Sequence, residues 1–329
     1  MTRYGFVASG GGYRSFYTCG ALVWLAQQGM SVTHITSTSS GNNIVLDYLM
    51  WDRTAEALPP TLTKTLRLSI KDIASVFANF LGLRPALLPN GSYLFTVDRD
   101  STRKSLLLDD PARRTQLTAS LKDTAWSIAT TNLSKRRSEC FAVRDLLPTV
   151  DDASLERFMD VFLAGITTVP YFKAISIGGD YYLEGGYTDN TPLRPVFDNP
   201  EVDEIIAVDF TDYDYHRELE RIYQKNLLML PMNSIDMYLL TADLGLTLPN
   251  AHVLAEARRI NALIAASKRK TLTADGKTYH AKPLHILRPK NLESMTVSLK
   301  HSAIQKEYFE LGQQEMAALA KGMGKADAG

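Results

Sequence analysis

Two strand–loop–helix units at the start of the chain place the strongest constraint on its fold. Apolar runs typical of buried strands cover residues 4–9 and 32–36. Each run is followed by a short loop and then by a helix-like apolar pattern, at residues 14–28 and 42–51, and Gly29 ends the first helix. This β–α–β–α order predicts a parallel sheet with helices packed on it and with ligands bound at the carboxyl ends of its strands.

The rest of the chain continues the α/β pattern. Further strands are predicted at residues 126–131, 139–143, 174–177, 181–183, 204–210 and 284–287, and further helices at residues 66–83, 152–164 and 302–319. Beyond residue 210 the chain is expected to be mostly helical, with interruptions at Pro231, Gly245 and Pro249. Two apolar segments, 66–83 and 227–240, fit either helical core or the lining of an apolar channel.

Charge and cysteine content argue against several classes of protein. The 36 basic and 36 acidic residues cancel, so no overall field attracts nucleic acid, and the basic runs at 135–137 and 268–270 fit solvated loops. Cys19 and Cys140 are too few for a disulfide framework, and Cys19 falls on a core-facing helix pattern. With no secretory signal and no membrane-spanning apolar run, we expect a cytoplasmic protein, peripheral at membranes or exported by a route that needs no N-terminal signal.

The loop after the first strand contains three consecutive glycines, Gly10, Gly11 and Gly12. A run of this kind suits a turn whose backbone N–H groups face an anion or a developing oxyanion without side chains in the way. The loop lacks the lysine of a phosphate-binding loop, and Ser15 stands where a dinucleotide loop has its third glycine. The same run also fits a plain tight turn, so the loop alone does not decide the function.

The loop after the second strand reads Ser37-Thr38-Ser39-Ser40-Gly41. On a tight strand-to-helix elbow, Ser39 would be exposed as a nucleophile and the residues two before and two after it must be small. A serine-rich loop without catalytic function is the alternative. A serine nucleophile needs a base, and a candidate acid follows a later strand in Glu184-Gly185-Gly186, with Asn190-Thr191-Pro192 downstream.

These three motifs together resemble the patatin-like phospholipase family, in its bacterial form. The family's G-G-G-x-R loop corresponds to Gly10 through Arg14, its G-x-S-x-G elbow to Ser37 through Gly41, and its D-G-[GA] motif to Glu184-Gly185-Gly186. The resemblance spans residues 4–210. It implies a three-layer α/β/α sandwich with a mostly parallel sheet, and we expect one domain over residues 1–320, with a motif-bearing core at 4–210, a helical part at 211–320 and a disordered tail at 321–329.

The resemblance also implies a lipid acyl hydrolase of phospholipase A or lysophospholipase type, acting on a phospholipid or another acyl ester. By resemblance Ser39 is the nucleophile and Glu184 the base of a Ser–acid dyad, and no cofactor or metal is implied. The glycine loop would supply the oxyanion hole. The implied oxyanion and supporting residues are Gly10, Gly11, Gly12, Arg14, Gly41, Gly185, Gly186 and Asn190.

Two departures from the family pattern leave alternatives open. Ser37 replaces the first elbow glycine, and Glu184 replaces an aspartate with a side chain one methylene longer. Glu184 is therefore a working base, a weakened base or a relic in a catalytically weak protein that binds lipid or a protein partner, and Asp189 is a substitute for it. A hydrolase triad of Ser39, Asp209 and His285 or His301, or a nucleotide-binding protein, are further alternatives.

Overall fold

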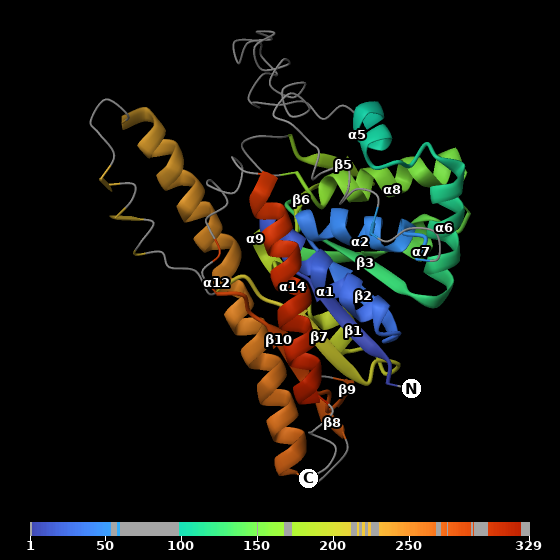
Figure 1. Ribbon diagram of the computed structural model, residues 1–329, viewed down its shortest axis with the longest axis vertical. Coiled ribbons are helices and arrows are strands. Elements are labelled where there is room, and N and C mark those ends of the chain that lie inside the picture. The colour runs from blue at the N-terminus through green and yellow to red at the C-terminus, as the bar shows by residue number, and fades with distance from the viewer. Residues whose placement is uncertain are drawn as a thin grey trace.

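A mostly parallel β-sheet lies at the centre of the structure (Figure 1). The structure is a computed structural model and describes residues 2–53, 58–59, 99–149, 151–167, 173–211, 216, 219–220, 223–224, 230–267, 271–274, 276–290, 292 and 302–323. The predicted helix at 66–83, the apolar residues 227–229, the basic run at 268–270 and His301 lie outside these ranges.

The sheet has the strand order β10–β7–β1–β2–β3–β6–β5, and β4 pairs with β3. Strands β10, β7, β1, β2 and β3 run parallel, whereas β4 and β6 run antiparallel to β3. The predicted strands are confirmed, with ends within two residues of those expected. Their bounds are β1 Tyr4–Ala8, β2 Val32–Ser37, β3 Ala125–Asn132, β4 Arg137–Ala142, β5 Ile175–Ile177, β6 Asp180–Glu184, β7 Glu204–Val208 and β10 Leu284–Leu287.

Two strands meet end to end along one edge of β3. Ile128 of β3 pairs both with β4 and with Ser37 of β2, so β4 and β2 lie on opposite edges of β3. Thr130 pairs both with β4 and with Glu184 of β6, so β6 lies on the same edge as β2. The carboxyl ends of β2 and β6, at Ser37 and Glu184, therefore approach each other two positions apart along β3.

Helices cover both faces of the sheet, which makes three layers (Figure 1). Phe6 and Ala8 of β1 face the side on which α1, α2, α8 and α14 pack. Val7 lies between them in the sequence and faces the other side, with α10 and α12. The predicted α/β/α sandwich is confirmed. The main helices are α1 Ser15–Gln27, α2 Ser40–Met50, α5 Arg99–Ser105, α6 Pro111–Asp123, α7 Val143–Leu146, α8 Asp152–Ala164, α9 Gly186–Asp189, α10 Arg194–Phe197, α12 Leu230–Ala266 and α14 Ser302–Met323.

Helix α14 packs along α1 at a glycine-to-backbone contact. A Cβ at Gly20 of α1 would lie 2.0 Å from the carbonyl oxygen of Phe309, and a Cβ at Gly312 of α14 would lie 2.0 Å from that of Tyr17. Alanine at either position would therefore push the two helices apart. The Tyr17 hydroxyl donates to Glu315 of α14 at 2.5 Å. Since α1 follows the glycine loop directly, the end of the chain supports the helix that anchors this loop.

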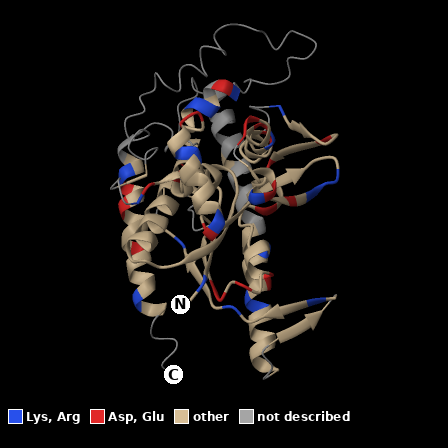
Figure 2. Cartoon of the chain, turned by 90° about the vertical axis from the view of Figure 1, so that its right-hand side faces the viewer, with Lys and Arg blue, Asp and Glu red and all other residues tan. Residues whose placement is uncertain are grey.

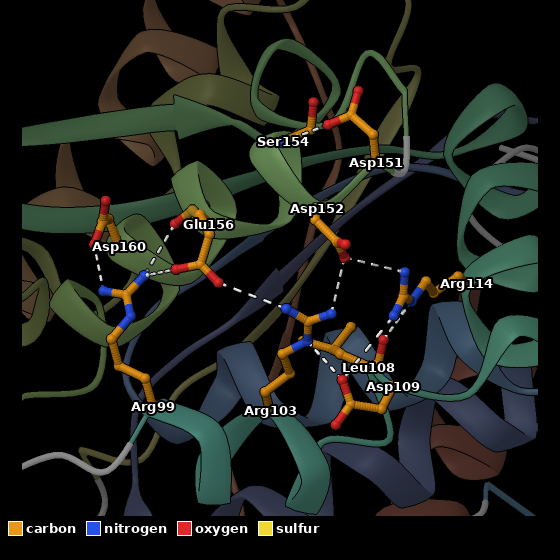
Figure 3. A network of polar contacts seen from close by, with 10 residues as sticks. All are labelled: Arg99, Arg103, Leu108, Asp109, Arg114, Asp151, Asp152, Ser154, Glu156 and Asp160. Atoms are coloured by element: carbon orange, nitrogen blue, oxygen red, sulfur yellow. Dashed lines mark hydrogen bonds and ion pairs between the residues drawn. The ribbon is translucent and has the colours of Figure 1, made fainter.

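A network of ion pairs holds α5 and the loop before α6 against α8 (Figure 3). Arg99 of α5 contacts Asp160 of α8 at 2.5 Å. Arg103 contacts Asp109 at 2.6 Å and Asp152 of α8 at 3.0 Å. A single exposed ion pair contributes little to the free energy of folding, so the stabilising effect of this group comes from side chains that each pair with more than one partner. It fixes α8, which packs against β3 and β6.

The C-terminal third differs from the expected pattern in three places. Gly245 and Pro249 lie inside the continuous helix α12 and do not interrupt it. An internal proline costs about 3 kcal/mol, and here the burial of Leu254 and Ala257 against the sheet offsets that cost. Helix α14 includes residues 321–323, which were expected to be disordered. A separate hairpin of β8 (Thr271–Ala274) and β9 (Lys277–His280) was not predicted.

Other expectations concern the core and the membrane. Cys19 is 2% exposed and lies in the core, as its position in the helix pattern predicts. None of the helices in the described ranges combines the length and the apolar character that crossing a membrane requires.

Candidate active site

Ser39 occupies a strained elbow between β2 and α2. Its backbone angles are φ 54° and ψ −133°, a region that residues other than glycine adopt at a cost of about 1–3 kcal/mol. Its N–H donates to the carbonyl oxygen of Gly165 at 3.0 Å, and the N–H of Thr38 donates to that of Ala8 at 3.2 Å. A Cβ at Gly41 would lie 2.3 Å from the Ala8 oxygen. The elbow predicted from the small residues is therefore present, and it requires a glycine at position 41.

The serine at the first elbow position is accommodated by a buried hydrogen-bond network. Ser37 is fully buried. Its Oγ donates to Oδ1 of Asn42 at 2.6 Å and accepts from the indole N–H of Trp126 at 2.7 Å. The amide of Asn42 in turn donates to the oxygen of Gly165 at 3.3 Å. A hydroxyl with both a donor and an acceptor partner costs little to bury, so Ser37 supports the elbow in place of the family's glycine.

The glycine loop lies directly against the elbow. A Cβ at Gly10 would be 2.6 Å from Cβ and 3.3 Å from Oγ of Ser39, so only glycine allows this approach. Gly12 has φ 57°, in the left-handed region that favours glycine. The N–H of Gly11 donates to Oγ of Ser40, the residue after Ser39, at 3.1 Å. The loop thus presents its backbone to Ser39, and the N–H of Gly11 already has an acceptor.

Two of the expected supporting residues hold this loop. Arg14 is 2% exposed, and its Nε donates to the oxygen of Gly11 at 3.2 Å. Its guanidinium lies 5.7 Å from the ring centre of Phe210, against which Gly11 also packs. The amide of Asn190 donates to the oxygen of Gly10 at 3.0 Å. Arg14 and Asn190 therefore bind successive carbonyl groups of the loop and turn its N–H groups away from them.

Glu184 is the last residue of β6 and is 4% exposed. Its N–H donates to the oxygen of Thr167 at 2.9 Å. A Cβ at the next residue, Gly185, would lie 2.4 Å from the oxygen of Ala129 and 2.5 Å from Oγ1 of Thr38. The chain at Gly185 is thus in contact with the residue before Ser39, and the end-to-end meeting of β2 and β6 brings the main chain of Glu184 to the same end of the elbow. Gly186, also buried, begins α9.

Asp189 lies at the end of α9. Burial raises the pKa of its carboxyl to about 7, and its Oδ1 is buried without a hydrogen-bond partner among the described residues. The positive charge of Arg194 and a hydrogen bond from the N–H of Thr191 oppose this shift. The hydrogen bond from Thr191 closes the turn after α9, and Asp189 stays an alternative to Glu184 as the base.

The acid and the histidine of a hydrolase triad are bound elsewhere. His285 lies on β10, where its Nε2 is 2.7 Å from Oε2 of Glu204. Asp209 is fully buried and accepts hydrogen bonds from Arg288 at 2.6 and 2.9 Å and from the hydroxyl of Thr211 at 2.8 Å. The two side chains are thus engaged by other partners, and they do not form the Asp–His pair that a triad requires.

Sequence analysis missed the residues beneath the elbow. Gly165, at the end of α8, accepts from both Ser39 and Asn42, and Trp126 reaches Ser37 from β3. The one available signal for Gly165 was a glycine directly after a predicted helix, which indicates a helix end and no more. Across the part of the chain that the structure describes, no three His, Cys, Asp or Glu side chains gather closely enough to hold a metal ion.

Comparison with solved structures finds several distant similarities. VipD from Legionella pneumophila has 13% identity and a TM-score of 0.40 over 98% of this chain and 67% of that one. Human GIVD cytosolic phospholipase A2 has 14% identity and a TM-score of 0.36, over 70% of this chain and 43% of that one. ExoU from Pseudomonas aeruginosa, in complex with SpcU, has 15% identity and a TM-score of 0.28, over 76% of this chain and 51% of that one.

No curated protein matches the chain. The model of the patatin-like phospholipase family matches residues 6–197, which is more than half of the chain and includes the glycine loop, the elbow and the Glu184 motif. The chain therefore belongs to the patatin-like phospholipase family.

Proposed function

We propose that this protein is a serine-dependent lipid acyl hydrolase of phospholipase A or lysophospholipase type. Membership of the patatin-like phospholipase family supports lipid hydrolase activity. The observation that carries the finer proposal is the strained elbow of Ser39, which is in contact with the glycine loop on one side and with the end of β6 on the other. Backbone strain at a loop between rigid elements is characteristic of a nucleophile held for reaction.

In the proposed reaction Glu184 accepts the Oγ proton of Ser39 while Oγ attacks the ester carbonyl carbon. The negative charge that develops on the carbonyl oxygen is stabilised by backbone N–H groups of Gly10 and Gly12, joined by Gly11 once the oxyanion replaces Ser40 Oγ as its acceptor. The tetrahedral intermediate then expels the alcohol, which takes the proton from Glu184. A water molecule, deprotonated by Glu184, then attacks the carbonyl carbon of the acyl-Ser39 ester. The fatty acid is released as the bond to Oγ of Ser39 breaks, and Oγ takes the proton back from Glu184.

Two features of the chain support this assignment of the base. Glu184 sits at a strand end, on main chain fixed by the hydrogen bond to Thr167 and by the tight contact of Gly185 with Ala129. Sites built on such elements hold their side chains more closely than sites on loops. His285 is bonded to Glu204 and Asp209 to Arg288, which leaves the dyad as the favoured arrangement.

A fluorophosphonate probe tests the nucleophile. We expect the purified protein to be labelled at Ser39, and Ser39→Ala to lose both the label and esterase activity on a soluble short-chain ester. Ser40→Ala is the matched control, because its hydroxyl lies one residue away and its loss should leave labelling at position 39. Hydrolysis retained by Ser39→Ala in folded protein would refute the assignment.

A second pair of variants tests the base and separates catalysis from lipid binding. Glu184→Ala should lose most of the turnover, whereas His285→Ala should keep it. A folded protein that binds lipid vesicles but is neither labelled nor active would instead support the alternative of a catalytically weak, lipid-binding member of the family.

A further inference from the structure

Two hairpin turns are joined side by side at the carboxyl end of the sheet. The first connects β3 to β4 and the second connects β5 to β6. The N–H of Leu133 donates to the oxygen of Tyr181 at 2.8 Å, and the N–H of Tyr181 donates to Oγ of Ser134 at 3.0 Å. Since β3 runs parallel to β2, this end of β3 is the end at which β2 leads into Ser39. In Figure 1 the strands β5 and β6 lie at the opposite end of the molecule from the β8–β9 hairpin.

This joined surface is apolar and hollowed. Leu133 is 45% exposed and Tyr181 is 51% exposed, and they are two of the four exposed large hydrophobic residues in the described part of the chain. Between them lies a shallow cavity of about 370 Å³, which Ser134, Lys173 and Ala174 also line. The two hydrogen bonds between the turns, one between main chains and one to the Ser134 hydroxyl, fix the spacing of Leu133 and Tyr181, so the two side chains form one patch.

The same surface carries uncompensated positive charge. Its two carboxylates are already paired, Asp180 with Lys135 at 2.6 Å and Glu139 with Arg137 at 2.6 Å. Arg136, at the tip of the first turn, and Lys173, at the cavity, are exposed and form no ion pair with a described residue. Figure 2 shows basic residues gathered on a projecting hairpin of the chain.

We propose that these two turns, defined by Leu133, Arg136, Lys173 and Tyr181, dock the protein on a membrane that contains anionic phospholipid. Leucine and tyrosine suit the boundary between headgroups and acyl chains, where the tyrosine ring is buried and its hydroxyl stays wet. The positive charges of Arg136 and Lys173 match the negative headgroups, and the cavity beside Lys173 is large enough for one headgroup. The proposal rests on the proposed function for its purpose, because docking there turns the Ser39 end of the sheet toward the lipid.

The backbone at Arg136 allows a clean test. Arg136 has φ 54°, in the left-handed region that glycine adopts without strain. Arg136→Gly therefore removes the charge while keeping or improving the stability of the turn. Lys173→Gln removes the second charge, and Leu133→Ser with Tyr181→Ser removes the apolar contact. Arg259→Glu is the control, because Arg259 is an exposed residue in the half of α12 that leads toward β8.

The measurement is co-sedimentation with vesicles of phosphatidylcholine, with and without phosphatidylserine, at low and high salt. We expect tighter binding to the vesicles with phosphatidylserine, weakened by salt and by about fivefold for each cation removed. The Leu133 and Tyr181 double variant should weaken binding to both vesicles, and Arg259→Glu should leave it unchanged.

Failure of this docking proposal can be distinguished from failure of the proposed function. Ser39→Ala should bind vesicles as the unmodified protein does, and Arg136→Gly with Lys173→Gln should hydrolyse a soluble short-chain ester at the normal rate. Binding that is the same with and without phosphatidylserine, or that Arg136→Gly and Lys173→Gln leave unchanged, would overturn the proposal. Binding lost by all variants including Arg259→Glu would overturn it as well, because the effect would then not belong to this surface.

Discussion

Gly10→Ala is the substitution for which the structure gives the largest expected effect on the site. The added methyl group would lie 2.6 Å from Cβ of Ser39 and 2.4 Å from Oδ1 of Asn190. Carbon atoms in contact normally lie about 3.5 Å apart or more, so the methyl is about 1 Å too close to Ser39. Ser39 is hydrogen-bonded to Gly165, and Asn190 is hydrogen-bonded to Gly10 of the loop itself. The clash can therefore be relieved mainly by moving the glycine loop away from the elbow.

A displacement of that size has a calculable consequence. A reacting group misplaced by about 1 Å loses on the order of a hundredfold in rate, which is about 2.7 kcal/mol of transition-state stabilisation. Overpacking of a tight site also costs about 1–3 kcal/mol in the free energy of unfolding. We therefore expect kcat on a soluble short-chain ester to fall about a hundredfold while urea unfolding still shows a folded protein.

Two controls make the result interpretable. Gly245→Ala adds the same methyl group inside α12, where nothing lies within 4 Å, and should leave activity intact with equal or higher stability. Gly10→Ala combined with Asn190→Ala removes the 2.4 Å contact but not the contact with Ser39, so it should recover stability more than activity. If Gly10→Ala kept kcat within twofold of the unmodified protein, the glycine loop would not lie against Ser39, the proposed nucleophile, as described.

Three further predictions follow from close contacts of the main chain and from the burial of a carboxyl group. Glu184→Asp should lower kcat at least tenfold, because the main chain at Gly185 is fixed and cannot follow the shorter side chain; equal or higher kcat in ester assays would contradict this. Asp189→Asn should stabilise the protein by up to about 4 kcal/mol above pH 8 and have no effect below pH 4, because the Asp189 carboxyl has a pKa of about 7 in the folded state against 3.8 when unfolded, so the native state loses stability as the pH rises between these values. Urea titrations at several pH values measure this change, and a gain in stability that does not depend on pH would show that the pKa of the carboxyl is not raised. Gly20→Ala should lower the free energy of unfolding by about 1–3 kcal/mol through its clash with Phe309, whereas Gly322→Ala, with nothing within 4 Å, should not; equal thermal midpoints for the two would refute the packing argument.

Much of the fold could be predicted because local patterns decide it. The buried strands β1, β2 and β7 have short apolar runs flanked by loop residues, and their ends were predicted within two residues. The demand for a small residue at Gly41 also followed from the elbow itself, and its contact with Ala8 confirms the steric reason. Such features depend on a few neighbouring residues, so one sequence carries them.

Features that depend on distant partners could not be predicted in this way. Pro249 and Gly245 would end an isolated helix, but the apolar side chains of α12 pack on the far face of the sheet and keep it continuous. The β8–β9 hairpin left a weak signal, an Asp-Gly pair between short polar runs, which Gly276 uses at φ 73°. The bonds of Gly165 to the elbow have no signal in the sequence, because they join residues more than a hundred positions apart.

The placement of Glu184 relative to Ser39, the acid and the nucleophile of the proposed dyad, shows why a glutamate at this position is not by itself evidence of lost function. The registers of β2 and β6 on β3 fix Ser37 and Glu184 two positions apart, and Ser39 follows Ser37 by two residues. That spacing is set by the sheet and does not vary with the length of the acidic side chain. The same sheet position can therefore serve a longer acid if the residues around it are built for that length. The buried pairing of Ser37 with Trp126 and Asn42 is an example of such adjustment beneath the same elbow, where a side chain larger than glycine is met by specific partners. The two departures from the family pattern, Ser37 and Glu184, thus lie on the two strands that meet along β3. The hydroxyl of Ser37 has both a hydrogen-bond donor and an acceptor as partners, which favours a site adapted to its residues over one that has decayed.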